Sequence, residues 1–189
     1  MIERWHHWPG RNRYQIFGAV AVALLAVTSS SGGTLPRLEG KSLADKNVVL
    51  PDDARGSAAI LIFGFTRASR SNTEAWSRRL ADDKAFAGVK IYNLPVLESV
   101  PRIFRGWVVS GIQKSVPVER RANFVPLFAK EKELKQVAGF SSPNDPYLVV
   151  LDRSGEVRFK YAGEISEAAY SSMLQKLISI NEADKIPAR

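Results

Sequence analysis

The side chains best placed to do chemistry in this sequence lie in a polar turn at residues 66–72. A continuous apolar run, Ala58–Phe65, precedes the turn, and a helix through Trp76 and Leu80 follows it. An apolar run without alternation predicts a strand buried on both faces. A helix that follows such a strand presents free backbone amides and partial positive charge at the carboxyl edge of the sheet. That field lowers the pKa of a thiol and suits a reactive cysteine.

The chain contains no cysteine and only two histidines, His6 and His7. Disulfides, thiolate metal sites and cysteine nucleophiles are therefore excluded. A serine in the turn has no histidine to activate it, because both histidines lie in the first few residues. We expect no catalytic residue, no metal site and no cofactor. The absence of cysteine favours a binding protein over an enzyme.

The first 33 residues have the layout of a signal peptide or an N-terminal membrane anchor. Met1–Gln15 carries three arginines and one glutamate, Ile16–Val27 is uninterrupted and apolar, and residues 28–33 are small and polar. Charged, apolar, then small is the pattern of a secretory signal. The apolar run is shorter than the roughly 20 residues of a full span, and an uncleaved anchor or a buried N-terminal helix are the alternatives. We expect a protein that is exported, periplasmic or anchored to the membrane.

The remaining chain divides into three parts. Residues 34–56 are expected to be a linker and an edge element, 57–180 one domain, and 181–189 a flexible tail. The helix after the polar turn is expected to be capped by Ser71 or Asn72, with Glu74 completing a capping box.

The segment Arg102–Val116 is predicted to be an amphipathic helix. Phe104, Val108 and Ile112 follow an i, i+4, i+8 line. The favoured interpretation is a core helix packed on the sheet. The alternative is a surface for a membrane or a partner protein. The residues of that surface are Arg102, Arg105, Trp107, Lys114, Arg120 and Arg121.

The net charge of +8 is compatible with anionic lipid, an acidic protein or nucleic acid as partner, or with an ordinary solvated surface. The pair Arg120–Arg121 is too short for a nucleic-acid patch, so no nucleic-acid partner is expected. The oligomeric state is not specified by the sequence.

The second half of the domain is predicted to be strand, turn, strand and helix. Tyr147–Leu151 is an apolar run, residues 152–155 form a hairpin turn, and residues 156–161 alternate. The helix at 164–180 should turn four residues inward, namely Tyr170, Leu174, Leu177 and Ile178.

This order resembles the thioredoxin arrangement, a βαβ half followed by a ββα half. It implies an α/β fold with a central mixed β-sheet flanked by α-helices. In thioredoxin-like proteins a proline, usually cis, precedes the third core strand beside the redox turn. Pro146 stands six residues before Asp152, as in the Pro-x-x-x-x-x-Asp-x-x-Gly pattern of membrane-tethered thioredoxins. The resemblance therefore implies a cis Pro146 that faces the turn.

The run Phe63-Gly64-Phe65-Thr66-Arg67-Ala68 resembles the Phe-Gly-Phe-Thr-x-Cys-Pro start of the Sco copper-delivery family. Ala68 replaces the first cysteine, and the second falls on Asn72 in the Sco register or on Ser71 in the thioredoxin register. Both sulfur positions are thus lost. The degenerate redox-turn positions are Thr66, Arg67, Ala68, Ser71, Asn72 and Pro146.

A second resemblance covers about residues 58–177. It is to the mitochondrial assembly factors that chaperone subunit a of ATP synthase, and to their bacterial relatives. Trp76 in the first helix, the segment Val116–Arg121 and the strand Tyr147–Asp152 are similar to motifs of that family, whereas Phe159 replaces its usual Trp. The resemblance implies a non-redox chaperone or assembly factor for a membrane complex of the cell envelope.

Three interpretations remain open. The chain is a cysteine-free binding or assembly factor at the cell envelope, a degenerate Sco- or peroxiredoxin-like oxidoreductase relative that retains ligand binding at residues 66–72, or a structural domain with an inert turn.

Overall fold

The structure is a computed structural model of the chain, and it describes residues 34–183. The expected signal or anchor in residues 1–33, with His6 and His7, lies outside the described residues. The last helix extends to Ala183, so the first three residues of the expected tail at 181–189 are helical.

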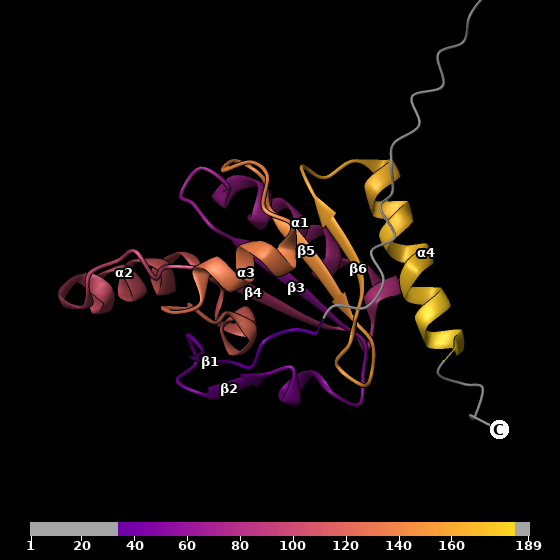
Figure 1. Ribbon diagram of the computed structural model, residues 1–189, viewed down its shortest axis with the longest axis horizontal. Coiled ribbons are helices and arrows are strands. Elements are labelled where there is room, and N and C mark those ends of the chain that lie inside the picture. Colours follow the sequence, from indigo (N-terminus) through magenta and orange to yellow (C-terminus); the bar gives the residue numbers. More distant parts are fainter. Residues whose placement is uncertain (1–33, 184–189) are drawn as a thin grey trace, which may run out of the picture.

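The sheet is mixed, as the sequence predicts (Figure 1). Its strand order is β4-β3-β5-β6, with β3 parallel to β4 and antiparallel to β5, and with β6 antiparallel to β5. A separate two-stranded sheet pairs β1 with β2. The strand bounds are β1 Leu38–Lys41, β2 Asn47–Leu50, β3 Ala59–Gly64, β4 Lys90–Pro95, β5 Tyr147–Leu151 and β6 Val157–Ala162.

The helices lie on both faces of the sheet, apart from one that projects from it (Figure 1). Their bounds are α1 Arg70–Asp82, α2 Arg102–Ser115, α3 Glu131–Ala138 and α4 Glu167–Ala183, with short 3₁₀ helices at Asp52–Ala54, Lys84–Phe86 and Val118–Asn123. No helix of residues 34–183 is both long enough and apolar enough to cross a membrane.

One face of the sheet is covered by α1 and α4. Trp76 and Leu80 of α1 pack with Met173 and Leu177 of α4 against β3 and β5, and all four side chains are buried. Of the four predicted inward positions of α4, Ile178 is wrong, because its side chain is 49% exposed and Ile180 enters the core instead. Leu174 is partly buried and packs against the core.

The other face is covered by α3 and by the β1–β2 hairpin. Leu134 of α3 is fully buried there. Leu38 pairs with Leu50 across the hairpin, and both side chains are buried. The segment at 34–56, expected to be a linker and an edge element, therefore supplies part of the hydrophobic core.

The outer edge of β4 is covered by an irregular segment. The amide of Val125 donates to the carbonyl of Asn93 at 2.8 Å, and the amide of Leu127 donates to that of Pro95 at 2.9 Å. This segment contains Pro126, which suits an edge position because proline has no amide hydrogen. The covered edge protects β4 from pairing with another chain.

Candidate functional site

The turn after β3 is closed by its own hydrogen bonds. The buried Ser69 donates its hydroxyl to the carbonyl of Thr66 at 3.0 Å, and its amide donates to the Thr66 hydroxyl oxygen at 3.3 Å. The Thr66 hydroxyl donates in turn to the carbonyl of Pro143. Arg67 and Ala68 point out of this closed turn and are exposed.

Helix α1 begins earlier than predicted. Its first residue is Arg70 and its N-cap is Ser69, so the capping box from Ser71 to Glu74 is wrong. The Ser69 hydroxyl is turned back into the turn and caps no amide of the helix. Glu74 instead accepts a hydrogen bond from the guanidinium of Arg70 at 2.8 Å, one helical turn away.

The side chains at the positions predicted to correspond to a cysteine pair have different surroundings. Ala68 and Ser71 are exposed, whereas Asn72 is half-buried. The Asn72 amide nitrogen donates to Glu164 Oε1 at 3.1 Å and to the carbonyl of Asn144 at 3.4 Å. Asn72 therefore links α1 to two loops, which is a structural role. No histidine occurs among residues 34–183, so Ser71 has no imidazole base in that region.

The prediction of a cis Pro146 is wrong, because the one cis peptide bond of the described residues is Leu50–Pro51. The carbonyl of Pro146 accepts the amide of Gly163 at 3.2 Å. This bond continues the β5–β6 pairing back to Pro146, which is buried and extends the strand. The loop before Pro146 still lies against the turn, through the hydrogen bonds from Thr66 and Asn72.

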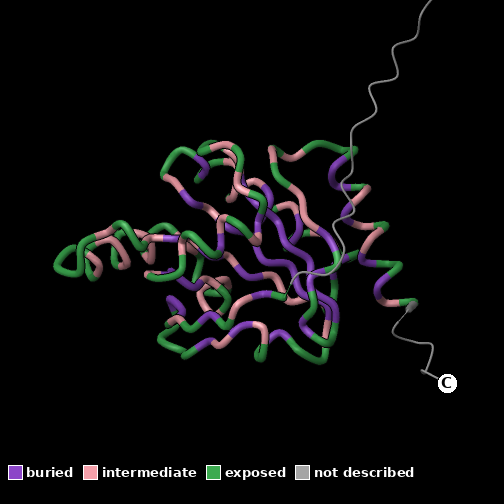
Figure 2. Tube along the Cα trace, viewed as in Figure 1, coloured by how far each residue is buried: buried purple, intermediate pink, exposed green. Residues whose placement is uncertain are grey.

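Helix α2 does not pack on the sheet, contrary to the favoured prediction. None of its residues is buried (Figure 2). Ile103 is 83% exposed, Trp107 80% and Phe104 53%. The reason is that its apolar residues occupy two sides of the helix. Ile103, Trp107 and Gly111 follow one i, i+4, i+8 line that faces solvent.

The second apolar side of α2 lies nearer the body, where Val108 and Ile112 are half-buried. The carboxyl half of the helix is fixed by polar contacts. Gln113 Nε2 donates to the carbonyl of Leu43 in the β1–β2 connection at 2.8 Å. Arg70 of α1 donates to the Ser115 hydroxyl oxygen at 3.0 Å. These contacts attach the carboxyl half of α2 to the body, whereas Ile103 and Trp107 near its amino end face solvent.

The predicted basic surface divides into two groups. Arg105 donates to the carbonyl of Val100 at 3.1 Å, and its guanidinium carbon lies 4.7 Å from the centre of the Phe128 ring. Arg120 pairs with Asp82 at 3.1 Å. Arg121 donates to two carbonyl groups at the end of α2. These three arginines hold the structure together.

The other predicted residues of this surface, Arg102, Trp107 and Lys114, are exposed. Neither Arg102 nor Lys114 forms an ion pair with another residue of 34–183. Sequence reasoning did not include Ile103, Phe104 or Val118 in the surface, although Val118 is 72% exposed. The signal that identifies Ile103 is its four-residue spacing from Trp107, on a different line from Val108.

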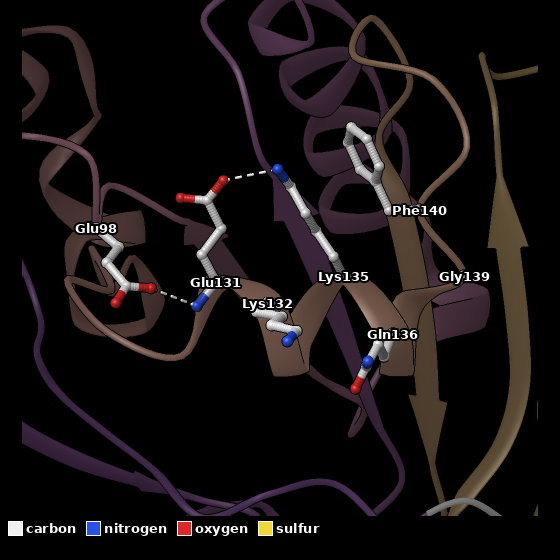
Figure 3. A pocket seen from close by; sticks show the side chains of 7 residues that line it. All are labelled: Glu98, Glu131, Lys132, Lys135, Gln136, Gly139 and Phe140. Atoms are coloured by element: carbon white, nitrogen blue, oxygen red, sulfur yellow. Dashed lines mark hydrogen bonds and ion pairs between the residues drawn. The ribbon is translucent and has the colours of Figure 1, made fainter.

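A shallow groove beside α3 collects four charged side chains, and three of them, Glu98, Glu131 and Lys135, form hydrogen bonds or ion pairs within the groove (Figure 3). Glu98 accepts the backbone amide of Glu131 at 2.7 Å, and Glu131 pairs with Lys135 at 2.7 Å. The Lys135 amine lies 4.6 Å from the centre of the Phe140 ring. The groove lining consists of Glu98, Glu131, Lys132, Lys135, Gln136, Gly139 and Phe140. Among residues 34–183, no cluster of three or more His, Asp or Glu side chains could hold a metal ion.

Among residues 34–183, the two carboxylates whose pKa is lowered, Asp83 and Asp152, lie outside the polar turn. A hydrogen bond from the Tyr170 hydroxyl, together with the Ala85 amide and Arg79, lowers the pKa of Asp83. Burial and the bond to Asp83 raise the pKa of Tyr170 to about 12. These groups join the end of α1 to α4, so their shifts accompany packing between helices.

Comparison with solved structures identifies the architecture. A thiol:disulfide interchange protein DsbE from Chlorobium tepidum superposes with a TM-score of 0.55 at 18% identity, covering 80% of this chain and 97% of that one. The exposed lipoprotein thioredoxin of Streptococcus pneumoniae gives a TM-score of 0.54 at 14% identity, and the match covers 75% of this chain and 99% of that one. BsSco, described as a member of the Sco family of cytochrome c oxidase assembly proteins, gives 0.53 at 12% identity, covering 79% and 94%.

The chain has a thioredoxin-like fold. At these identities the superpositions establish the fold alone. No protein-family model matches the sequence, and no curated protein matches it. In this thioredoxin-like chain the turn after β3 carries Ala68, Ser71 and Asn72, and α2 exposes three large apolar side chains, Ile103, Phe104 and Trp107.

Proposed function

We propose that this protein is a non-redox, thioredoxin-like binding factor of the cell envelope that assists the assembly of a membrane protein complex. The observation that carries this proposal is α2. It exposes Ile103, Phe104 and Trp107 on one side of a helix whose carboxyl end is fixed to the body. Exposed apolar patches on a soluble domain mark interaction surfaces.

The turn supports an enzymatic role less well. It has no thiol, and its buried polar side chain, Ser69, bonds within the turn itself. Asn72, which corresponds to the second cysteine in the Sco register, donates hydrogen bonds to Glu164 and to the carbonyl of Asn144. Residual ligand binding at residues 66–72 would have to use exposed side chains such as those of Arg67 and Ser71.

Three further observations support an assembly role at the envelope. The first 33 residues have the composition of a signal or membrane anchor. The sequence also resembles the ATP-synthase assembly factors, and the structural neighbours include lipoproteins and a member of a cytochrome c oxidase assembly family.

The experiment is a gene deletion in the source organism, followed by native-gel separation of solubilised membranes and quantitative mass spectrometry of each band. We expect at least one assembled membrane complex to fall several-fold while its unassembled subunits persist. Expression of the intact chain should restore the complex. An unchanged profile of membrane complexes would contradict the proposed function.

A further inference from the structure

The exposed side of α2 has both an apolar and a cationic component. Ile103 and Trp107 lie one helical turn apart, and Lys114 continues the same side of the helix two turns beyond Trp107. Phe104 flanks them. Tryptophan beside aliphatic side chains is the composition that enters the boundary between lipid headgroups and acyl chains.

The charges around this side are of one sign. Helix α2 contains three basic residues and no acidic residue. Residues 100–121 as a whole contain five basic residues against the single Glu119. Arg102 and Lys114 are exposed and form no ion pair with residues of the described chain. An apolar strip flanked by free cations is complementary to an anionic lipid surface, where each nearby cation adds attraction.

The glycines of α2 are consistent with a docking surface rather than an internal contact. A Cβ atom at Gly106 or Gly111 would meet no atom within 4 Å. Neither glycine is therefore required by packing inside the protein. Gly111 lies between Trp107 and Ser115 on the exposed side of α2. Because glycine has no side chain, a partner surface could approach the helix backbone closely at this position.

We propose that the α2 side formed by Ile103, Phe104, Trp107, Arg102 and Lys114 docks into the interfacial region of an anionic lipid bilayer. This deepens the proposed function and rests on it for the exported location. It places the protein on the membrane in one orientation, with α2 against the lipid and with α4, at the opposite end of the long axis (Figure 1), away from it.

The chain offers a direct probe because it has no cysteine, so one introduced cysteine is a unique labelling site. Gly111→Cys on α2 is labelled with an environment-sensitive nitrobenzoxadiazole dye in the full chain. Ser171→Cys, exposed on α4, is the matched control. Emission is recorded with vesicles of phosphatidylcholine alone and with vesicles that contain phosphatidylglycerol. Because the dye reports its own surroundings, attachment through the first 33 residues does not produce the signal.

We expect a blue shift for the Gly111→Cys label on anionic vesicles, and none for the Ser171→Cys label on the same vesicles. Arg102→Glu with Lys114→Glu should lower the fraction of shifted label about tenfold at low salt. Ile103→Ser with Trp107→Ser should abolish the shift with the melting temperature unchanged, because these side chains are exposed.

Three results would overturn the inference. The first is no shift at Gly111→Cys while the protein sediments with the vesicles. The second is an equal shift on phosphatidylcholine, which removes the anionic surface as partner. The third is a shift without vesicles as protein concentration rises, which indicates a second copy. The deletion experiment is independent of these outcomes, so the proposed function and this inference can fail separately.

Discussion

The guanidinium of Arg121 donates to the carbonyl of Gln113 at 2.8 Å and to the carbonyl of Val116 at 3.0 Å. These oxygens belong to the last turn of α2 and to the residue that follows it. Carbonyls at the end of a helix lack partners within the helix, and a cation there also complements the helix dipole. Arg121 therefore fixes the carboxyl end of α2, while the side chains of Ile103, Phe104 and Trp107 near its amino end remain exposed.

We predict that Arg121→Ala lowers the free energy of unfolding by about 1–2 kcal/mol, because two charge-assisted hydrogen bonds are lost. Urea denaturation followed by far-ultraviolet circular dichroism measures the change. Arg102→Ala is the matched control on the same helix, and should stay within about 0.5 kcal/mol of the parent. Equal destabilisation by the two variants would show that Arg121 has no special role.

A second prediction concerns Trp76, which is fully buried and donates from Nε1 to the carbonyl of Gly163 at 3.1 Å. Its ring also meets Tyr161 edge to face, with 5.5 Å between ring centres. Trp76→Phe leaves the Gly163 carbonyl without this donor and should cost about 2–3 kcal/mol. Denaturant unfolding of the variant measures the change in the free energy of unfolding. A decrease below about 0.5 kcal/mol would show that the bond from Trp76 to Gly163 does not stabilise the fold.

The third prediction is a dependence of stability on pH that comes from Asp152. Burial alone would raise the pKa of this carboxyl, but hydrogen bonds from Ser154, Arg158 and the Glu156 amide hold it below its ordinary value. Because the folded-state pKa is depressed, the stabilisation is present above the unfolded pKa of about 4. It is lost as pH falls through the folded-state pKa.

Asp152→Asn should therefore lower stability at pH 7 by about 2 kcal/mol. The difference between parent and variant should shrink as pH falls below about 4, because the unfolded parent binds a proton at Asp152 there while the folded parent does so only at lower pH. Guanidinium titrations at pH 7 and pH 3 measure both differences. A gap between parent and variant that is the same at the two pH values would be incompatible with this explanation.

A fourth prediction is that the purified protein does not reduce insulin disulfides, does not turn over peroxide and does not bind Cu(I) tightly. Each of these reactions requires a thiolate as nucleophile or soft ligand, and the chain contains no cysteine. Standard turbidity, peroxidase and copper-competition assays, run beside a thioredoxin with its cysteine pair, provide the comparison. Turnover well above a blank without protein would overturn the prediction.

Much of the fold is predictable because its central strands are apolar throughout. Ala59–Gly64 and Tyr147–Leu151 stand out for that reason, and the turn at 152–155 follows from Gly155. The pairing of Leu38 with Leu50 is not predictable, because short segments interrupted by glycine and proline become strands only when a distant partner is present. The hydrogen bond from the Gly163 amide to the Pro146 carbonyl likewise joins residues that come together only when β5 pairs with β6.

The sequence predicts the helix that carries the candidate surface, but not that the helix is exposed. The period of Phe104, Val108 and Ile112 predicts the helix, but an amphipathic pattern is the same whether its apolar side meets the protein's own sheet or an external partner. The finer signal is that Ile103 and Trp107 form a second apolar line, which one contact surface cannot bury. The roles of Arg105, Arg120 and Arg121 are not predictable from the sequence, because their partners Phe128, Asp82 and the backbone carbonyls are brought close only by folding.

The central claim is that α2, and not the turn at residues 66–72, is the functional surface. The most direct test compares how well variants of the two surfaces complement the deletion strain. One variant carries Ile103→Ser and Trp107→Ser on α2, and the other carries Arg67→Ala and Ser71→Ala at the turn. All four positions are exposed, so both proteins should fold and accumulate like the parent. We predict that the turn variant restores the assembled membrane complex fully, whereas the α2 variant leaves it several-fold depleted. Full restoration by the α2 variant, with failure of the turn variant, would contradict the account.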